Sequence, residues 1–397
     1  MPSSFLLDAS LEETLCRVLK IDPAEWRATK ALWESGTAWT IHHIPKKNGV
    51  RIIHAPSDPL KLVLRSVLKL FLQCIPVHMA VHGAHPGTSI VTNARAHVGD
   101  KAFYFLDLKD AFPSTNRKRC ASVLGPRLAT HLADATDLSE KDSKRLAETL
   151  IDLLIVDDVL PQGFPTSPAV LNVVLGAVDR VLSQLLRAES EKEGVVYRYT
   201  RFVDDLTIST DAPEISKKLR QSIRRAITHD GWTIQGTKVH YFGDAEEGDE
   251  ERTTRNPEVT GIIPNPDGRL TIPRPRLNKF RAILHDLLTA STQRLEGDAE
   301  ALGKLQAQFD LFRELCKKRK VWIQPNLTLQ EWCGNDWPLS PRERQIIVGI
   351  VGFVGMVYDQ QLPSIIRKPY NEAKVRFGIG LRDMAGINGY NLDTEIC

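Results

Sequence analysis

The chain has 397 residues, 42% of them hydrophobic, and 52 Lys and Arg residues against 49 Asp and Glu residues, which gives a net charge of +3. This length supports a sizeable core in two or three subdomains, and the charge balance excludes a histone-like polycation and an acidic disordered chain. The charge is uneven: removing the six acids of residues 244–251 raises the net value to +9, and residues 269–320 carry twelve bases against six acids.

Helices are predicted for most of the first forty residues. Ser10 and Glu13 form a potential capping box, and Asp22 followed by a proline is typical of a second helix start. Residues 46–56 predict a turn followed by a short strand that ends at a proline. Residues 60–75 have apolar side chains at helical spacing.

The middle of the chain mixes strands and helices. Residues 101–108 form an apolar strand that ends on an acid, and residues 139–155 and 168–187 have helical patterns. Residues 197–210 predict a strand, a tight Asp-Asp turn and a second strand, and residues 269–273 close the region. Neither a βαβ repeat nor a glycine-rich phosphate loop is found in the sequence, so the α+β class is expected rather than a doubly wound sheet.

The C-terminal part is predicted to be helical from Pro275 onwards. An apolar stripe runs along its first helix, and a further helix begins at Ser340 with Glu343 as its capping partner.

The location of the protein is predicted from its cysteines and its hydropathy. The six cysteines form no CxxC pair, and no signal peptide precedes them. The longest apolar run, residues 346–357, is shorter than the roughly twenty residues that a membrane span needs. We therefore expect a soluble, cytoplasmic protein without a membrane partner.

Three acids form the candidate catalytic group. Asp204 and Asp205 are neighbours between β-prone segments, and two such charges about 4 Å apart repel by roughly 4 kcal/mol at an effective dielectric of about 20. On their own they could equally form a solvated turn. Asp107, however, ends an apolar strand, where an unpaired carboxylate is unfavourable. Together the three predict a site for two divalent ions, with Mg²⁺ favoured by oxygen ligands and phosphoryl or nucleotidyl transfer as the chemistry.

Three segments resemble motifs of the reverse transcriptases, in that family's order and spacing. Residues 107–112 (DLKDAF) resemble motif A, residues 160–168 (LPQGFPTSP) motif B and residues 202–205 (FVDD) motif C. The resemblance implies an RNA-directed DNA polymerase with a right-hand fold of fingers, palm and thumb, a mixed antiparallel palm sheet and a helical thumb. It assigns catalysis to Asp107, Asp204 and Asp205. The implied metal-binding set is Asp107, Leu108, Asp204 and Asp205.

The same resemblance implies contacts to an incoming deoxynucleoside triphosphate. Phe112 matches the aromatic gate that excludes a ribose 2′-hydroxyl, and Gln162 matches the motif B glutamine that contacts the nucleotide. Lys47 and Arg51 match the basic fingers that bind the triphosphate, a task that suits a guanidinium. Lys238 matches the motif D lysine near the pyrophosphate. The alternative for the two lysines is a solvated surface position, and for the phenylalanine a place in the core.

Two shorter signatures narrow the resemblance to retron-type reverse transcriptases. Asn93 and His97 fit the signature NAxxH, and Val259, Thr260 and Gly261 fit the signature VTG. In that family a cognate structured non-coding RNA is both template and primer, and synthesis starts from an RNA 2′-hydroxyl. The product is a branched RNA–DNA molecule that acts in anti-phage defence. These five residues are therefore expected to contact RNA, and any effector protein is expected to be a separate chain.

The basic C-terminal part is expected to hold RNA, because an A-form duplex is recognised through its shape, phosphates and 2′-hydroxyls. A solubilising surface is the alternative. The expected domains are N-terminal helices and fingers (1–100), palm with part of the fingers (101–273), thumb (274–360) and an extension of unknown role (361–397). The residues expected to contact RNA in the thumb are Arg274, Arg276, Lys279, Arg281, Lys317, Lys318, Arg319 and Lys320.

Two other hypotheses stay open. Another bacterial defence reverse transcriptase would synthesise DNA from a protein primer or without a template, and an RNA-binding scaffold would carry a dispensable polymerase site. The intact Asp107, Asp204 and Asp205 argue against the scaffold. A group II intron maturase is disfavoured because no endonuclease module is recognised in the sequence.

Overall fold

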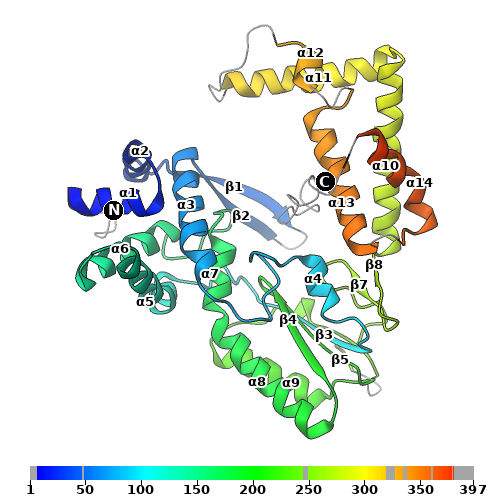
Figure 1. Ribbon diagram of the computed structural model, residues 1–397. Coiled ribbons are helices and arrows are strands. Elements are labelled where there is room, and N and C mark those ends of the chain that lie inside the picture. Colours follow the sequence, from blue (N-terminus) through cyan, green and yellow to red (C-terminus); the bar gives the residue numbers. More distant parts are fainter. Residues whose placement is uncertain are drawn as a thin grey trace. The chain divides into compact units, whose positions relative to one another are not determined.

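The computed structural model describes residues 7–46, 49–244, 249–318, 327–333, 338–358, 361–377 and 379 (Figure 1). The chain divides into two compact units, of which the first ends at Thr260 and the second begins at Gly261. Each unit has its own buried apolar residues.

Three helices form the N-terminal part of the first unit: α1 (Ala9–Leu19), α2 (Pro23–Glu34) and α3 (Asp58–Leu70). α2 begins as predicted, and the Asp22 carboxylate accepts a hydrogen bond from the Ala24 amide at 2.6 Å. The capping box predicted at Ser10 is wrong. Asp8 caps α1 instead, because its carboxylate accepts a hydrogen bond from the Leu11 amide at 3.0 Å, so the helix begins before Ser10.

A long antiparallel hairpin separates α2 from α3 and consists of β1 (Trp39–Lys46) and β2 (Gly49–Pro56). The predicted strand is confirmed as β2. The sequence did not reveal β1, because seven of its eight residues are exposed and no alternation of apolar and polar residues marks it. Residues 47 and 48 at the tip lie outside the described residues, and with them lies the predicted nucleotide contact of Lys47.

Six further α-helices are found among the described residues of the first unit: α4 (Ile90–Arg95), α5 (Arg117–Ala135), α6 (Glu140–Leu154), α7 (Ser167–Val174), α8 (Gly176–Glu193) and α9 (Lys217–His229). α6 confirms the helix predicted from residue 139. The predicted helix 168–187 is two helices, α7 and α8, bent by 47° around Leu175. Where the structure is described, no single helix is long and apolar enough to cross a membrane, and only this bent pair meets both criteria jointly.

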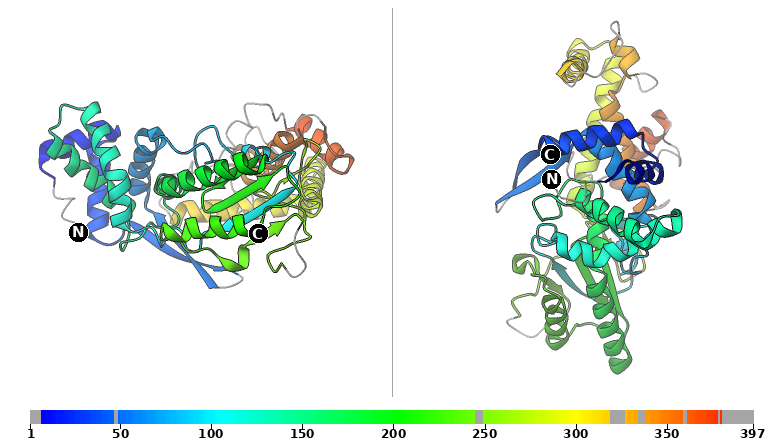
Figure 2. Two further views of the ribbon diagram at one scale, coloured as in Figure 1. Left: turned by 90° about the horizontal axis from the view of Figure 1, so that it is seen from below. Right: turned by 90° about the vertical axis from the view of Figure 1, so that its left-hand side faces the viewer.

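A four-stranded antiparallel sheet in the order β4–β5–β3–β6 forms the centre of the first unit. Its strands are β3 (Ala102–Asp107), β4 (Tyr197–Phe202), β5 (Asp205–Thr210) and β6 (His240–Phe242). β3 is buried on both faces, with Tyr104 paired to Tyr241 and Phe103 stacked on Phe105. α8 packs along β4, and α9 lies beside α8 (Figures 1 and 2). Helices around an antiparallel sheet confirm the expected α+β class.

The second unit is mainly helical. Its elements are β7 (Ile263–Pro264), β8 (Leu270–Thr271), α10 (Arg274–Leu295), α11 (Ala299–Lys318), α12 (Leu329–Cys333), α13 (Pro341–Tyr358) and α14 (Ser364–Arg376). The predicted capping box of α13 is confirmed, because the Ser340 amide donates to the Glu343 carboxylate at 2.8 Å and the Glu343 amide donates to Ser340 Oγ at 3.3 Å. The buried Arg294 of α10 also donates to Glu343, at 2.9 Å, and so ties α13 to α10.

Candidate active site

The sheet brings together the three acids singled out from the sequence. Asp107 is the last residue of β3 and Asp205 the first of β5, and the register of these antiparallel strands places them opposite each other. Asp204 lies in the turn between β4 and β5, where its carbonyl oxygen accepts a hydrogen bond from the Leu108 amide at 3.1 Å. The convergence predicted from a strand end and a hairpin therefore exists, and strand pairing produces it.

The electrostatics of these acids favour a cation. Burial, together with the charges of Asp204 and Asp107, raises the pKa of Asp205 to about 7. Burial and the charge of Asp107 also raise the pKa of Asp204. Lys238 Nζ lies 2.6 Å from Asp107 Oδ2 and offsets part of the negative charge. Arg51 is near enough that its charge lowers the pKa of Asp204.

The donor set suits a hard divalent ion, since the carboxylate oxygens face few competing partners. Leu108 has no side-chain donor, so it could contribute only its carbonyl oxygen. Within the described ranges no group of three or more His, Cys, Asp or Glu residues is arranged so that it could hold a metal ion by itself. Mg²⁺ at sites of this kind is commonly held by one or two carboxylates together with substrate phosphates, so a closed cage is not required.

The turn that carries Asp204 is strained. Phe202 pairs with Asp205, so the turn consists of Val203 and Asp204 rather than the predicted Asp-Asp pair. Val203 has a φ of 60°, in the left-handed region that a β-branched residue rarely adopts. Such a conformation persists only where the surrounding structure determines it.

A buried polar network holds this turn from behind. Arg201 donates to the Val203 carbonyl at 2.7 Å and to Asn172 Oδ1 at 2.9 Å, and its guanidinium is paired in two places with Asp179, at 2.7 and 2.8 Å. Asn172 in turn donates to the Gly83 carbonyl at 2.7 Å. Arg201, Asn172 and Asp179 are all nearly inaccessible to solvent. The network thus connects α7, α8 and the Gly83 loop to the backbone that presents Asp204.

Gly83 belongs to this support through its lack of a side chain. A Cβ at this position would lie 2.8 Å from the Val203 amide nitrogen and 2.9 Å from Val203 Cγ2. None of Gly83, Asn172, Asp179 and Arg201 was selected from the sequence. The one available signal was Arg201 itself, a charged residue inside a strand otherwise suited to burial, which requires a partner of opposite charge.

The motif B segment is attached to the hairpin of β1 and β2. The His54 amide donates to the Gln162 carbonyl at 2.7 Å, and Gly163, with a φ of 108°, passes so close that a Cβ would lie 2.6 Å from the His54 carbonyl. Phe112 is half-buried against the core. Arg51 is exposed on β2, the same strand as His54. Of the predicted nucleotide-binding residues, Lys238 contacts Asp107 and Arg51 acts on Asp204 through its charge. The contact of any of these residues with a nucleotide stays a prediction.

The structure contradicts direct RNA contact by three of the signature side chains, because Asn93, His97 and Val259 are at most 1% exposed. His97 hydrogen-bonds Ser209 Oγ and Thr200 Oγ1, both at 2.6 Å, and so bridges β4 and β5. Burial, with smaller contributions from His82 and Arg198, lowers the pKa of His97 to about 3 and keeps the ring neutral.

The two signatures contact each other. Thr260 Oγ1 donates to the Ile90 carbonyl at 3.2 Å and lies 3.4 Å from Asn93 Nδ2, which joins the VTG segment to α4. Thr260 itself has a φ of 49°. Asn93, His97 and Val259 therefore have a scaffolding role in the structure. Thr260 and Gly261 are half-buried, and their RNA contact stays a prediction.

The predicted thumb contacts differ in their surroundings. Arg276 donates to the Gly261 carbonyl at 3.2 Å and lies over the Phe353 ring, so much of its bonding capacity is used within the second unit. Arg274, Lys279 and Arg281 are exposed on α10 and remain predicted RNA contacts. The side chains of the other predicted contacts lie outside the described residues, namely Lys317, Lys318, Arg319 and Lys320.

The sequence was compared with known families and proteins. Residues 44–262, more than half of the chain, match the family described as "Reverse transcriptase (RNA-dependent DNA polymerase)". Retron Mx65 reverse transcriptase of Myxococcus xanthus is 36% identical over 61% of this chain and 54% of its own length. Retron Mx162 reverse transcriptase of the same organism is 29% identical over 77% of this chain and 64% of its own length. Retron Ec73 reverse transcriptase of Escherichia coli is 30% identical over 47% of this chain and 57% of its own length.

These relatives confirm the resemblance to retron-type reverse transcriptases expected from the sequence. The chain spans 54% and 64% of the length of the two Myxococcus proteins. Among solved structures, a telomerase from Candida albicans aligns over 91% of this chain and 70% of its own at 10% identity and a TM-score of 0.41, a similarity too low to carry a conclusion.

Replacing Gly83 with alanine should displace the strained turn, because the new Cβ would collide with the Val203 backbone. We expect the rate of primer extension to fall by about 10–100-fold, since misplacement of a reacting group by about 1 Å costs this much. The thermal unfolding midpoint should change little. Gly125→Ala is the matched control, because its Cβ would meet only Ile151 Cδ1 at 3.7 Å. Wild-type extension by Gly83→Ala would contradict the support assigned to this loop.

Proposed function

We propose that this chain, which belongs to the reverse transcriptase family, is an RNA-directed DNA polymerase that copies a cognate structured non-coding RNA. The observation that carries the proposal is the β3–β5 register, which holds Asp107 opposite Asp205 beside Asp204. Three acids at one sheet end, two of which (Asp204 and Asp205) have raised pKa values, are suited to divalent ions and to nucleotidyl transfer.

In this proposal Asp107, Asp204 and Asp205 hold two Mg²⁺ ions, with the Leu108 carbonyl as a further oxygen donor. The ions would supply charge stabilisation for the attacking and leaving oxygens of an in-line transfer. Lys238, bound to Asp107 without substrate, is close enough to exchange this partner for a phosphate oxygen. Burial lowers the pKa of Lys238, but the hydrogen bond to Asp107 and the negative charges of the three acids outweigh this effect and raise the pKa. The side chain therefore stays cationic for that role.

The nucleotide would enter between β2 and the motif B segment. Arg51 and Lys47 are proposed to bind the triphosphate. Gln162 is proposed to contact the nucleotide, and Phe112 to exclude a 2′-hydroxyl. The support for this placement is the hydrogen bond between His54 and Gln162, which joins the strand of Arg51 to motif B.

The retron-type part of the proposal rests on the curated relatives and their names. It comprises synthesis from an RNA 2′-hydroxyl, a branched RNA–DNA product, action in anti-phage defence and a separate effector chain. We assign fingers to residues 1–100, palm to 101–273 and thumb to 274–360, with exposed α10 bases on the RNA. None of Cys16, Cys74, Cys120 and Cys333 forms a disulfide, which agrees with a reducing compartment, and the cytoplasm is the proposed location.

Changing Asp204 and Asp205 together to asparagine should reduce DNA synthesis by at least about 10³-fold, because the site loses two of its three charged donors. RNA binding, measured by filter retention, should be nearly unchanged. The control is Asp134→Asn with Asp137→Asn, an equal charge change at exposed positions around the end of α5. Full DNA product from the double variant of the active site would overturn the catalytic assignment.

Phe112→Ala should raise the incorporation of ribonucleotides relative to deoxynucleotides by at least about tenfold, because the ring that excludes the 2′-hydroxyl is removed. Competition between labelled dNTP and rNTP in primer extension measures the ratio. Phe112→Tyr keeps the ring and should keep the selectivity. An unchanged ratio in Phe112→Ala means that the residue is a core aromatic and not a gate.

The nucleic acid that co-purifies with the protein separates retron-type synthesis from the other defence enzymes. We expect sequencing to find one structured RNA joined through a 2′–5′ branch to complementary DNA. Debranching treatment should release the DNA with a free 5′ end. RNA-free protein that makes DNA of random sequence, or DNA bonded to protein, would favour untemplated or protein-primed synthesis instead.

A further inference from the structure

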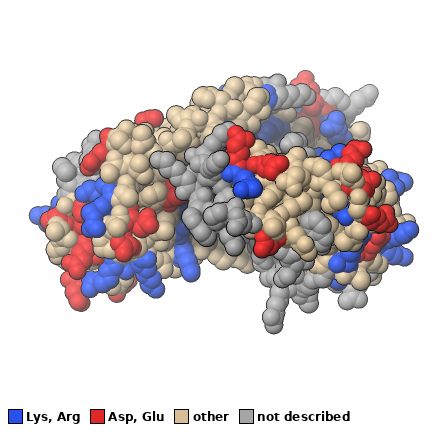
Figure 3. Space-filling model, turned by 90° about the horizontal axis from the view of Figure 1, so that it is seen from above, with Lys and Arg blue, Asp and Glu red and all other residues tan. Residues whose placement is uncertain are grey.

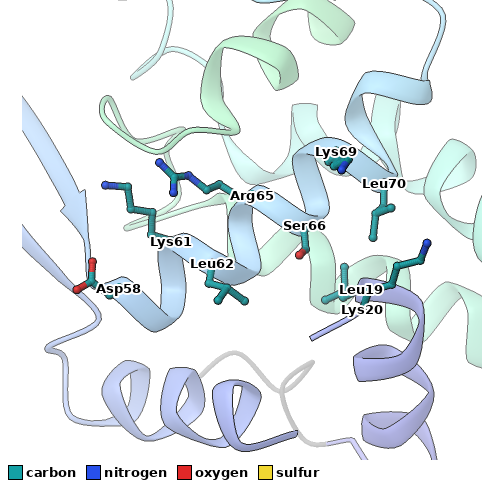
Figure 4. A pocket seen from close by; sticks show the side chains of 9 residues that line it. All are labelled: Leu19, Lys20, Asp58, Lys61, Leu62, Arg65, Ser66, Lys69 and Leu70. Carbon is teal, nitrogen blue, oxygen red and sulfur yellow. The ribbon is translucent and has the colours of Figure 1, made fainter. Parts of the chain in front are cut away.

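A basic groove lies in the first unit between the C-terminal end of α1 and the exposed side of α3. Its volume is about 570 Å³, and its charged and polar lining consists of Lys20, Lys61, Arg65, Lys69, Asp58 and Ser66. Figure 4 shows Lys61 and Arg65 on one side of α3 and Leu62 and Ser66 on the opposite side, with Leu70 facing Leu19 and Lys20 at the end of α1. None of these residues belongs to the candidate active site.

The cations of the groove form a regular row. Lys61, Arg65 and Lys69 are four residues apart on α3, so they follow one another at about 6 Å along the helix axis. Lys20 lies at the other wall and is the residue that follows the last turn of α1. Its backbone is in the left-handed conformation, and its amide donates to the Arg17 and Cys16 carbonyls. Its backbone is therefore fixed at the groove edge. Four bases against one lining acid give the groove a concentrated positive charge.

The side chains of these bases are free of hydrogen bonds and ion pairs with other described residues. On two other helices of the unit, by contrast, exposed bases are paired with neighbouring acids. Lys144 pairs with Glu140 on α6, and Arg187 pairs with Glu191 on α8. Figure 3 likewise shows Lys and Arg interspersed with Asp and Glu over most of the face it presents. A solubilising surface does not require a row of bases without acids, whereas binding of a polyanion does.

We propose that this groove binds the phosphate backbone of a double-stranded part of the RNA partner, outside the active site. The proposal rests on the proposed function, which supplies a structured RNA as the polyanion. A row of cations on a rigid helix matches the repeating charge of a nucleic-acid backbone, which dominates the affinity of such complexes.

The lining indicates a duplex rather than exposed bases. Single-stranded nucleic acids are bound chiefly by aromatic side chains on which bases stack, and the lining residues include no aromatic ring. They also include no carboxamide that could read base edges. Leu19, Leu62 and Leu70 supply only apolar surface. The lining can therefore recognise phosphates through its bases, and contacts to phosphates are one of the ways in which proteins bind A-form duplexes.

The position of the groove links RNA docking to the active site. α3 follows β2 through Ser57, and the Ser57 amide donates to the Ala38 carbonyl before β1, at 2.8 Å. The hairpin of β1 and β2 carries Arg51 and is bonded to motif B through His54 and Gln162. A stem bound on α3 would therefore be held by the same unit that binds the nucleotide, so the groove would set where the template enters.

The test measures binding of two fluorescein-labelled RNAs, a hairpin stem and an unstructured single strand, to the full chain without nucleotides. The groove variant is Lys61→Gln, Arg65→Gln, Lys69→Gln. The matched control is Lys217→Gln, Lys218→Gln, Arg225→Gln, three exposed bases of α9 with the same charge change. Fluorescence anisotropy over a series of salt concentrations gives the Kd and its salt dependence. Circular dichroism verifies that both variants are folded.

For the stem, the groove variant should lose at least about tenfold in affinity. The slope of log K against log salt is negative, and its magnitude should fall by about three, because each lost phosphate contact removes about one from it. The control should stay within about twofold of the wild type. Because no DNA synthesis enters this measurement, it does not depend on whether the chain is a polymerase.

Unchanged affinity of the groove variant for the stem would overturn the proposal. An equal loss for the single strand would overturn the assignment to duplex RNA. Binding of anionic phospholipid vesicles that the groove variant alone loses, with stem affinity unaltered, would overturn it in favour of a membrane surface. Extension of a short annealed primer should keep its kcat in the groove variant, and a loss there would assign Lys61, Arg65 and Lys69 to the polymerase site instead.

Discussion

The register between β3 and β5 places like charges side by side, and much of the first unit is arranged around that constraint. Two carboxylates about 4 Å apart repel by roughly 4 kcal/mol at an effective dielectric of about 20, and burial makes ionisation costlier still. The raised pKa values of Asp204 and Asp205 express this cost. Lys238 and Arg51 offset part of it, and divalent ions would offset the rest.

The strained turn of Val203 and Asp204 needs support from elsewhere in the chain. The buried pair of Arg201 and Asp179 provides it, because each charge neutralises the other and Arg201 still has a donor for the Val203 carbonyl. Removing either partner would leave an uncompensated buried charge, which costs several kcal/mol. Tyr199 completes the arrangement by donating to Asp179 at 2.7 Å. The site thus depends on residues that never reach the substrate.

His97, from the NAxxH signature, also supports the sheet that carries the acids. His97 joins β4 to β5 through Thr200 and Ser209, and Asp100 accepts hydrogen bonds from Ser209 and Arg198. Burial raises the pKa of Asp100 to about 6, although Ser209 and Arg198 lower it. Because the imidazole stays neutral, it links two hydroxyl groups without adding charge to an already acidic region. The exposed bases of α10 and α3 are the proposed RNA contacts.

The sequence by itself determined the chemistry and most of the local structure. The three candidate acids, the α+β class, the caps at Asp22 and Ser340 and the helices around them all follow from residue type and periodicity, which are local properties. Only the tertiary structure decided which residues support the site and which contact solvent. Gly83, Asn172, Asp179 and Arg201 are distant in the chain and meet through packing, and the burial of His97 turned an expected RNA contact into a structural link. Burial and long-range pairing depend on how elements pack, and no local pattern encodes them.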